Sequence, residues 1–211
     1  KIKQIVGRLN TQNLSEEEER ENVEAISELI EYYKGIFTIL SSCAARQLEE
    51  VTFRRSTISV ADLCEYAVKY FRKASKGKTS RIEFLTESTE KRIIGDINQL
   101  RFLLENLIDE ALTVREDGIL KLHAAEDGNY IRFLFTDTRR EKSVDELNKL
   151  FYPNLARMTS GEKGELRGTE YLICKQIIRD HDEFAGRRGC RINAEPAQEG
   201  GFTVYFTLPK R

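Results

Sequence analysis

The stretch "GDINQLRFLLENLIDEAL", from Gly95 to Leu112, holds the clearest helical pattern of the chain. Asp96 stands where a side-chain oxygen can cap a helix N-terminus. Apolar residues then recur at spacings of three and four, as an amphipathic helix requires: Leu100, Leu103, Leu104, Leu107 and Ala111. The spacing predicts a helix from Asp96 to about Val114.

Around this helix, strand and helix patterns alternate. "RIEFLTES" and "KRIIG" precede it as short strands, and "GILKLHAA" and "NYIRFLFT" follow it as a hairpin across the turn "EDGN". The final strand alternates with Phe202, Val204, Phe206 and Leu208 on one side. Three more helices are expected. The first is capped by Ser59 and has one apolar face: Leu63, Ala67, Val68 and Phe71. The second covers Ser143 to Tyr152, and the third runs from Gly168 to about His181 with a repeating stripe: Leu172, Ile173, Gln176 and Ile177. Because hairpins outnumber crossovers, this order predicts an α/β two-layer sandwich with helices on one face of a mixed sheet.

The first 52 residues have a different pattern. Apolar residues step by three and four along a heptad seam: Val23, Ile26, Ile30, Tyr33, Phe37, Leu40 and Ala44. The seam predicts a helical hairpin that forms a homodimer, although packing within one chain explains the same pattern. We therefore expect a partial helical hairpin over residues 1–52 and an α/β domain over residues 53–211.

Composition excludes several classes of protein. The 211 residues are 40% hydrophobic and 33% charged, with a net charge of −1, so a generally basic nucleic-acid surface is not expected. No stretch approaches the roughly 20 apolar residues of a membrane span. Four dispersed cysteines and two histidines lack zinc-site spacing, and reduced thiols are expected. Because the chain begins at Lys1 inside a helical pattern, we expect it to be a fragment of a longer protein.

Several segments in order resemble sensor histidine kinases and their GHKL (HATPase_c) ATPase relatives. The N box of that family reads D-x-x-x-L-x-x-x-L-x-N-L-x-x-N-A, and six residues of the helix fall in register: Asp96, Leu100, Leu104, Asn106, Leu107 and Ala111. "FTDTRREKSVDELNKLFYP" resembles the G1 and F boxes, "GTEYLICKQIIRDH" the G2 box with its helix, and "GFTVYFTLPKR" the last strand. The chain is also similar to a Bacteroidetes-type group of histidine-kinase-like proteins.

The resemblance implies a Bergerat-type sandwich that binds ATP and Mg²⁺. It assigns Asp137 to the adenine amino group, Asn106 to a polar position in the site, and Glu110 to the Mg²⁺ ligand, where the family has asparagine. The loop from Tyr152 to Arg167 would be the ATP lid, with Arg157, Lys163 and Arg167 as candidate phosphate contacts. The phosphoacceptor histidine would lie upstream of Lys1, whereas His123 and His181 are expected to be structural.

Four replacements depart from the family pattern at the site. Arg139 and Glu141 stand at the two G1 glycines, and Glu110 replaces the metal-binding asparagine. In the G2 box Gly168 is kept, but Glu170 replaces the next glycine. Glycine-rich turns before helices bind phosphate through exposed N–H groups, and a glutamate placed there repels phosphate. The replacements therefore predict that binding of ATP and Mg²⁺ is degenerate.

Three functions follow as hypotheses. The first expectation is a histidine-kinase-like signalling domain of a two-component system, acting as a pseudokinase in phosphotransfer or dimerisation with a response-regulator receiver domain as partner. The alternatives are an active ATP-dependent sensor kinase that phosphorylates an upstream histidine, and a non-enzymatic α/β interaction module. A cytoplasmic location is expected, in a fragment that suits a membrane-anchored sensor.

Overall fold

The computed structural model describes residues 20, 23, 53–76, 80–152 and 169–211. Residues 53–153 and 170–211 form one compact unit. Of the expected dimer seam, Val23 is helical and 61% exposed. The other seam residues lie outside the described part of the chain, so the hairpin and the boundary at residue 52 stay predictions.

The elements follow one another in the order that the sequence predicts. The strands are β1 (Ser56–Ser59), β2 (Ile82–Glu87), β3 (Arg92–Gly95), β4 (Gly118–Asp127), β5 (Tyr130–Asp137), β6 (Ile192–Pro196) and β7 (Phe202–Pro209). The helices are α3 (Val60–Ala74), α4 (Ile97–Ala111), α5 (Val144–Lys149) and α6 (Thr169–Phe184).

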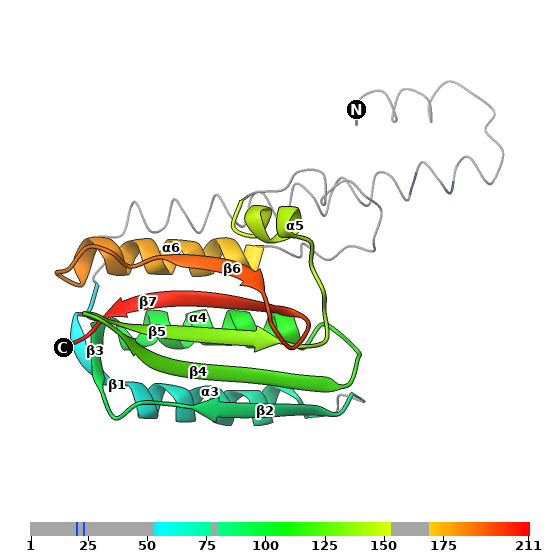
Figure 1. The fold of residues 1–211 in the computed structure, drawn as a ribbon, viewed down its shortest axis with the longest axis horizontal. Coiled ribbons are helices and arrows are strands. Elements are labelled where there is room, and N and C mark those ends of the chain that lie inside the picture. The colour runs from blue at the N-terminus through cyan, green and yellow to red at the C-terminus, as the bar shows by residue number, and fades with distance from the viewer. Residues whose placement is uncertain (1–19, 21–22, 24–52, 77–79, 153–168) are drawn as a thin grey trace, which may run out of the picture. The chain divides into compact units, whose positions relative to one another are not determined.

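The main sheet has the order β2-β4-β5-β7-β6. β2 runs parallel to β4, and the other neighbours are antiparallel. β1 and β3 form a separate antiparallel pair, which local sequence patterns did not predict. Figure 1 views the sheet from its open side, with α3, α4 and α6 behind it. The prediction of an α/β sandwich with a mixed sheet is thus confirmed.

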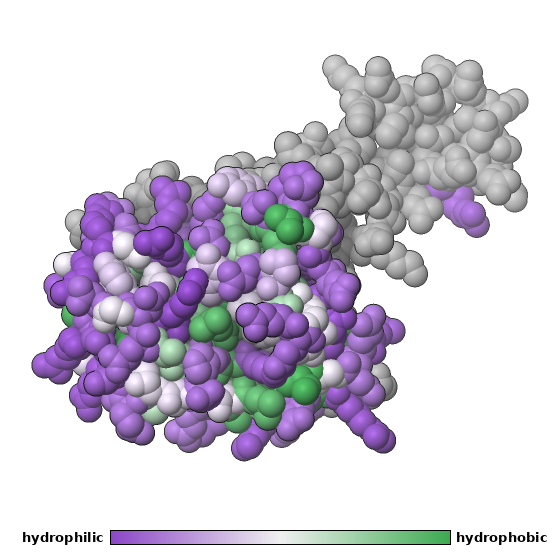
Figure 2. Space-filling view, in the orientation of Figure 1, coloured by the Kyte–Doolittle hydropathy of each residue, from purple (hydrophilic) through white to green (hydrophobic). Residues whose placement is uncertain are grey.

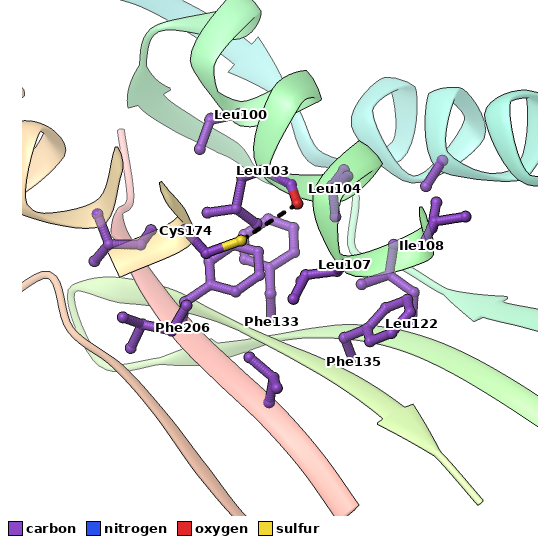
Figure 3. Packing of buried hydrophobic residues seen from close by; sticks show 14 of the residues in the cluster. Leu100, Leu103, Leu104, Leu107, Ile108, Leu122, Phe133, Phe135, Cys174 and Phe206 are labelled. Atoms are coloured by element: carbon purple, nitrogen blue, oxygen red, sulfur yellow. Dashed lines mark hydrogen bonds between the residues drawn. The ribbon is translucent and has the colours of Figure 1, made fainter. Parts of the chain in front are cut away.

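The core lies between the sheet and these helices. Alternation along β5 sends Ile131, Phe133 and Phe135 inward, and the fully buried rings of Phe133 and Phe206 stack with centroids 4.9 Å apart. α4 covers them with the leucines that its spacing predicted (Figure 3). Burial of each such side chain contributes about 1.5–3 kcal/mol.

α6 buries a different face from the one that the sequence predicted. Its buried residues are Tyr171, Cys174, Ile177, Ile178, Asp180 and His181. Of the predicted stripe only Ile177 is buried, whereas Leu172, Ile173 and Gln176 are half-buried. The prediction missed this because tyrosine, cysteine and histidine carry polar groups, yet each fills the core here. Cys174 Sγ, for example, donates to the Leu103 carbonyl at 3.7 Å (Figure 3).

Buried hydrogen bonds fix the start of α4, in a joint formed by Asp96 and His181. Asp96 caps the helix as predicted, because its Oδ1 accepts from the Asn98 N–H at 2.9 Å. Its own N–H donates to His181 Nε2 at 3.1 Å, while His181 Nδ1 lies 2.8 Å from the Ile177 carbonyl oxygen. A carbonyl accepts and an N–H donates, so His181 is neutral with its proton on Nδ1. The prediction that His181 is structural agrees with this geometry.

The outer face of the sheet meets solvent. Figure 2 shows this face, where hydrophilic residues surround small apolar patches. His123 lies there, with Nδ1 2.9 Å from the exposed carboxylate of Glu87. No helix among the described residues has the length and apolar character that crossing a membrane requires.

Candidate functional site

Asp137 ends strand β5 on the core side of the sheet. It continues the inward alternation of the strand and is 1% exposed, although it carries a carboxylate. A buried carboxylate needs hydrogen-bond donors or an opposite charge. The residues that follow the strand supply both.

Arg139 folds back onto Asp137 and fills the space beside it. Its Nε and Nη2 donate to the two carboxylate oxygens at 2.8 and 2.9 Å, and its backbone N–H donates to Oδ1 at 3.1 Å. Nη2 also donates to the Ala111 carbonyl at the end of α4, at 2.7 Å. The Arg139 side chain is 0% exposed, so the guanidinium lies inside the domain.

Two glycines make room for this arrangement. A Cβ on Gly118, at the start of β4, would lie 2.4 Å from Arg139 Cγ. A Cβ on Gly201 would lie 1.9 Å from the Asp137 carbonyl oxygen, so the turn before β7 crosses the end of β5 in close contact. Neither glycine was predicted as a site residue, although a glycine at the start of a strand is a signal of close backbone approach.

Arg140 pairs with the second acidic group of the site. Its Nη1 lies 3.1 Å from Glu110 Oε1, and its Nε lies 3.3 Å from Asp137 Oδ2. Its guanidinium carbon lies 5.5 Å from the centroid of the Phe202 ring. The side chains of Arg140 and Glu110 are 17% and 7% exposed, so this second ion pair is also largely shielded.

Burial and the neighbouring charges shift the pKa values of two groups in the cluster. Burial lowers the pKa of Arg140, but the neighbouring Tyr171, Glu110 and Asp137 outweigh it, and the net shift is upward. Burial, with the nearby Glu110 charge, raises the pKa of Tyr171. Arg140 therefore stays charged and the Tyr171 phenol stays neutral.

The other predicted site residues lie apart or outside the described residues. Asn106 is buried on α4, where its side-chain amide donates to the carbonyl of Phe102, at 2.7 Å, in the preceding turn. Glu141 is exposed, and Glu170 is the second residue of α6. Gly168 and the lid candidates Arg157, Lys163 and Arg167 lie outside the described residues. The described residues contain no cluster of three or more metal-binding side chains.

Comparison with known proteins assigns the sequence to a family. The sequence model described as "Histidine kinase-, DNA gyrase B-, and HSP90-like ATPase" matches residues 95–211. The chain belongs to this family. Its C-terminal part is therefore a histidine-kinase-like ATPase domain of the kind found in two-component systems, and the resemblance of the boxes is confirmed at this level.

Two curated relatives are sensor kinases of Escherichia coli. The signal transduction histidine-protein kinase BaeS is 26% identical over 164 residues, which are 75% of this chain and 33% of BaeS. The sensor histidine kinase RcsC is 25% identical over 127 residues, 59% of this chain and 13% of RcsC. The chain thus spans a third or less of the length of these relatives.

Solved histidine kinases share the fold. The catalytic domain of ThkA matches with a TM-score of 0.58 and 21% identity, over 74% of this chain and 98% of that domain. ThkA in complex with the response regulator protein TrrA matches with a TM-score of 0.62 and 19% identity, over all of this chain and 57% of ThkA. Full-length ShkA in complex with AMPPNP matches with a TM-score of 0.64 and 18% identity, over 96% of this chain and 41% of ShkA.

Proposed function

We propose that residues 53–211 are a signalling domain of a two-component system whose inherited nucleotide site no longer binds ATP and Mg²⁺. The domain would act as a pseudokinase: it transmits conformation within a homodimer, or it passes a phosphoryl group from an upstream histidine to a response-regulator receiver domain. The proposal places it at the cytoplasmic end of a longer sensor. Its main support is the buried ion pair between Arg139 and Asp137.

Arg139 competes directly with adenine for the Asp137 carboxylate. The resemblance assigns the carboxylate to the adenine amino group, a neutral donor. Arg139 already supplies a charged, bidentate donor, which forms the stronger hydrogen bonds. It is also tethered two residues away, so it competes at a high effective concentration. Adenine would have to displace it and leave a guanidinium without its acid.

The candidate Mg²⁺ ligand is also paired with an arginine. Glu110, which the resemblance assigns to Mg²⁺, is paired with Arg140. Arranged like this, the side chains do not fit a bound Mg²⁺–ATP, since both carboxylates that would hold it already bind arginines. The resemblance also assigns Glu170 to a G2 glycine position, where its negative charge would repel phosphate.

Binding of Mg²⁺–ATP tests the proposal. A functional site raises the free energy of unfolding by about 2.7 kcal/mol at a ligand concentration 100-fold above Kd. We expect the melting temperature of the chain to stay unchanged at millimolar Mg²⁺–ATP or ADP. A saturable rise in the wild-type chain, absent from a folded Asp137→Asn variant, would instead show that the site binds nucleotide and would favour the active kinase.

The double variant Arg139→Gly/Arg140→Gly is the matched comparison. Nucleotide binding by this variant alone would show that the two arginines block the site. If the double variant is folded and still does not bind nucleotide, the wild-type conclusion stands and the two arginines alone do not explain the loss of binding. A chain that neither binds nucleotide nor interacts with a receiver domain would favour the α/β interaction module.

A further inference from the structure

A hollow of about 220 Å³ lies on the open face of the sheet. It is at the N-terminal end of β5, whereas Asp137 is at the C-terminal end of that strand. Alternation along the strands sends Arg132 to this face, opposite Thr207 on β7, with Tyr205 two residues before Thr207. Gly189 and Arg191, from the basic segment between α6 and β6, complete the wall together with Asp127 and Tyr130.

Arg132 has no acidic partner among the described residues. Its guanidinium carbon lies 4.3 Å from the centroid of the Tyr205 ring, which holds the group in place. Its Nε is buried and makes no hydrogen bond within the described part of the chain. Buried N–H groups are nearly always satisfied, and a charged one left without an acceptor is costly. Arg139 and Arg140, by contrast, both reach carboxylates.

The segment that carries Arg191 is held firmly against the hollow. The Arg191 N–H donates to Thr207 Oγ1 at 3.1 Å, and that hydroxyl donates to the Gly189 carbonyl at 3.2 Å. The Tyr130 hydroxyl donates to the Arg188 carbonyl. From α6, the Asp182 carboxylate accepts from the N–H groups of Gly189 and Cys190.

The charge of the lining favours an anion. Two arginines line the hollow against one acid, Asp127. Asp182 lies beside the same segment, but its carboxylate binds backbone N–H groups and pairs with Arg188 at 3.2 Å. A guanidinium offers N–H donors in a planar fork that matches the oxygens of phosphate and carboxylate.

We propose that this hollow is an oxyanion site, in which Arg132 and Arg191 bind a phosphate or carboxylate group of a ligand. The site lies on the face of the sheet opposite the helices and shares no residue with the Asp137 cluster. It is therefore independent of whether the domain binds nucleotide.

Titration of the whole chain with inorganic phosphate and with acetate tests the site, at constant pH and with ionic strength matched by chloride. The arginine Nε–H signals are followed by ¹H–¹⁵N NMR. We expect the Arg132 signal to shift saturably with at least one of the two anions. Phosphate alone indicates a phosphorylated ligand, acetate alone a carboxylate, and both a general oxyanion site.

Arg132→Gln, followed through the Arg191 Nε–H signal, should weaken the binding about tenfold, through the loss of a charge-assisted hydrogen bond. The exposed arginine on α3 gives the control Arg72→Gln, which should keep the wild-type Kd. If Arg132→Gln fails to fold, Arg191→Gln should weaken binding in the same assay. Shifts that do not saturate, or that are equal in all variants, show only non-specific screening and overturn the proposal.

Discussion

At the scale of single residues, the pair of Asp137 and Arg139 defines the candidate site. Their side chains are 1% and 0% exposed, so the ion pair is shielded from water. For such a pair the loss of hydration largely offsets the attraction, and its net contribution to stability is small. One member left alone is costly, because its charge stays buried without compensation.

The substitution Asp137→Ala should therefore destabilise the domain strongly. It leaves the Arg139 guanidinium buried without its acid, and we expect the free energy of unfolding to fall by about 3–5 kcal/mol. Urea denaturation followed by circular dichroism measures this change. The double variant Asp137→Ala/Arg139→Ala should recover part of the loss, since no unpaired charge remains.

Glu126→Ala is the control for this series. Glu126 pairs with Lys91 and Lys210 at the surface, where the attraction is screened by water, so its removal should hardly move the urea midpoint. A loss for Asp137→Ala no larger than that of Glu126→Ala would show that the buried pair is not maintained in solution.

The sequence located Asp137 and Arg139 but left the direction of the Arg139 side chain open. That direction depends on contacts with residues far away along the chain. Ala111 accepts a hydrogen bond from the guanidinium, and Gly118 leaves space for the aliphatic part of the side chain. Neither contact could be predicted from local patterns.

At the scale of elements, the joint of His181 and Asp96 connects α6 to the start of α4. Burial lowers the pKa of His181 from its usual value of 6.5, and the Ile177 carbonyl, Asp96 and Asp180 oppose this shift. The folded chain therefore takes up a proton at His181 less readily than the unfolded chain. Protonation also removes the acceptor for the Asp96 N–H.

This predicts a pH dependence of stability with a definite sign. The contribution of His181 is fully present above the unfolded pKa and is lost as the pH falls below about 6.5. The slope approaches about 1.4 kcal/mol per pH unit. His181→Gln should remove this part of the slope in urea denaturation at a series of pH values. Equal slopes for the two proteins would contradict the assignment.

The same joint should make Gly95 sensitive to substitution. A Cβ there would lie 2.9 Å from His181 Cδ2 and Nε2, in the buried ring that bonds the next residue. We expect Gly95→Ala to lower the free energy of unfolding by about 1–3 kcal/mol, as overpacking does. Gly128→Asn is the control, because nothing lies near its Cβ and asparagine tolerates its positive φ. Thermal unfolding of both variants compares them.

Helix patterns predicted α4 better than α6. The apolar stripe of α4 and its Asp96 cap agree with the structure, since leucines make up most of that face. The buried face of α6 contains Tyr171, Cys174 and His181, and residue type gave no sign that these side chains, each with a polar atom, would be buried.

At the scale of the whole molecule, the heptad seam predicts that the chain dimerises. Ile30→Asp, in the middle of the seam, should shift the chain from dimer to monomer in sedimentation equilibrium, because it places a charge in an apolar interface. Glu31→Gln, next to it and outside the seam, should remain dimeric. A wild-type chain that is monomeric at high concentration would contradict the prediction.

The sequence predicted the layers of the domain but not its complete strand pairing. Hairpins such as that of β4 and β5 follow from a short turn. The pairing of β1 with β3, and the parallel pairing of β2 with β4, join strands that are separated by a whole helix. Local sequence patterns carry little information about such distant partners.

That parallel pair has a consequence for how the chain reaches its fold. The turn at Gly128 lets β4 and β5 meet within microseconds, since few residues separate them. Strand β2 can join β4 only after the chain between them, including α4, has been ordered, so closing this contact has a larger entropic cost. Among the described strands, β2 pairs with β4 alone, at the edge of the sheet. We therefore expect β2 to join the sheet late in folding and to be among the first strands to exchange its amide hydrogens.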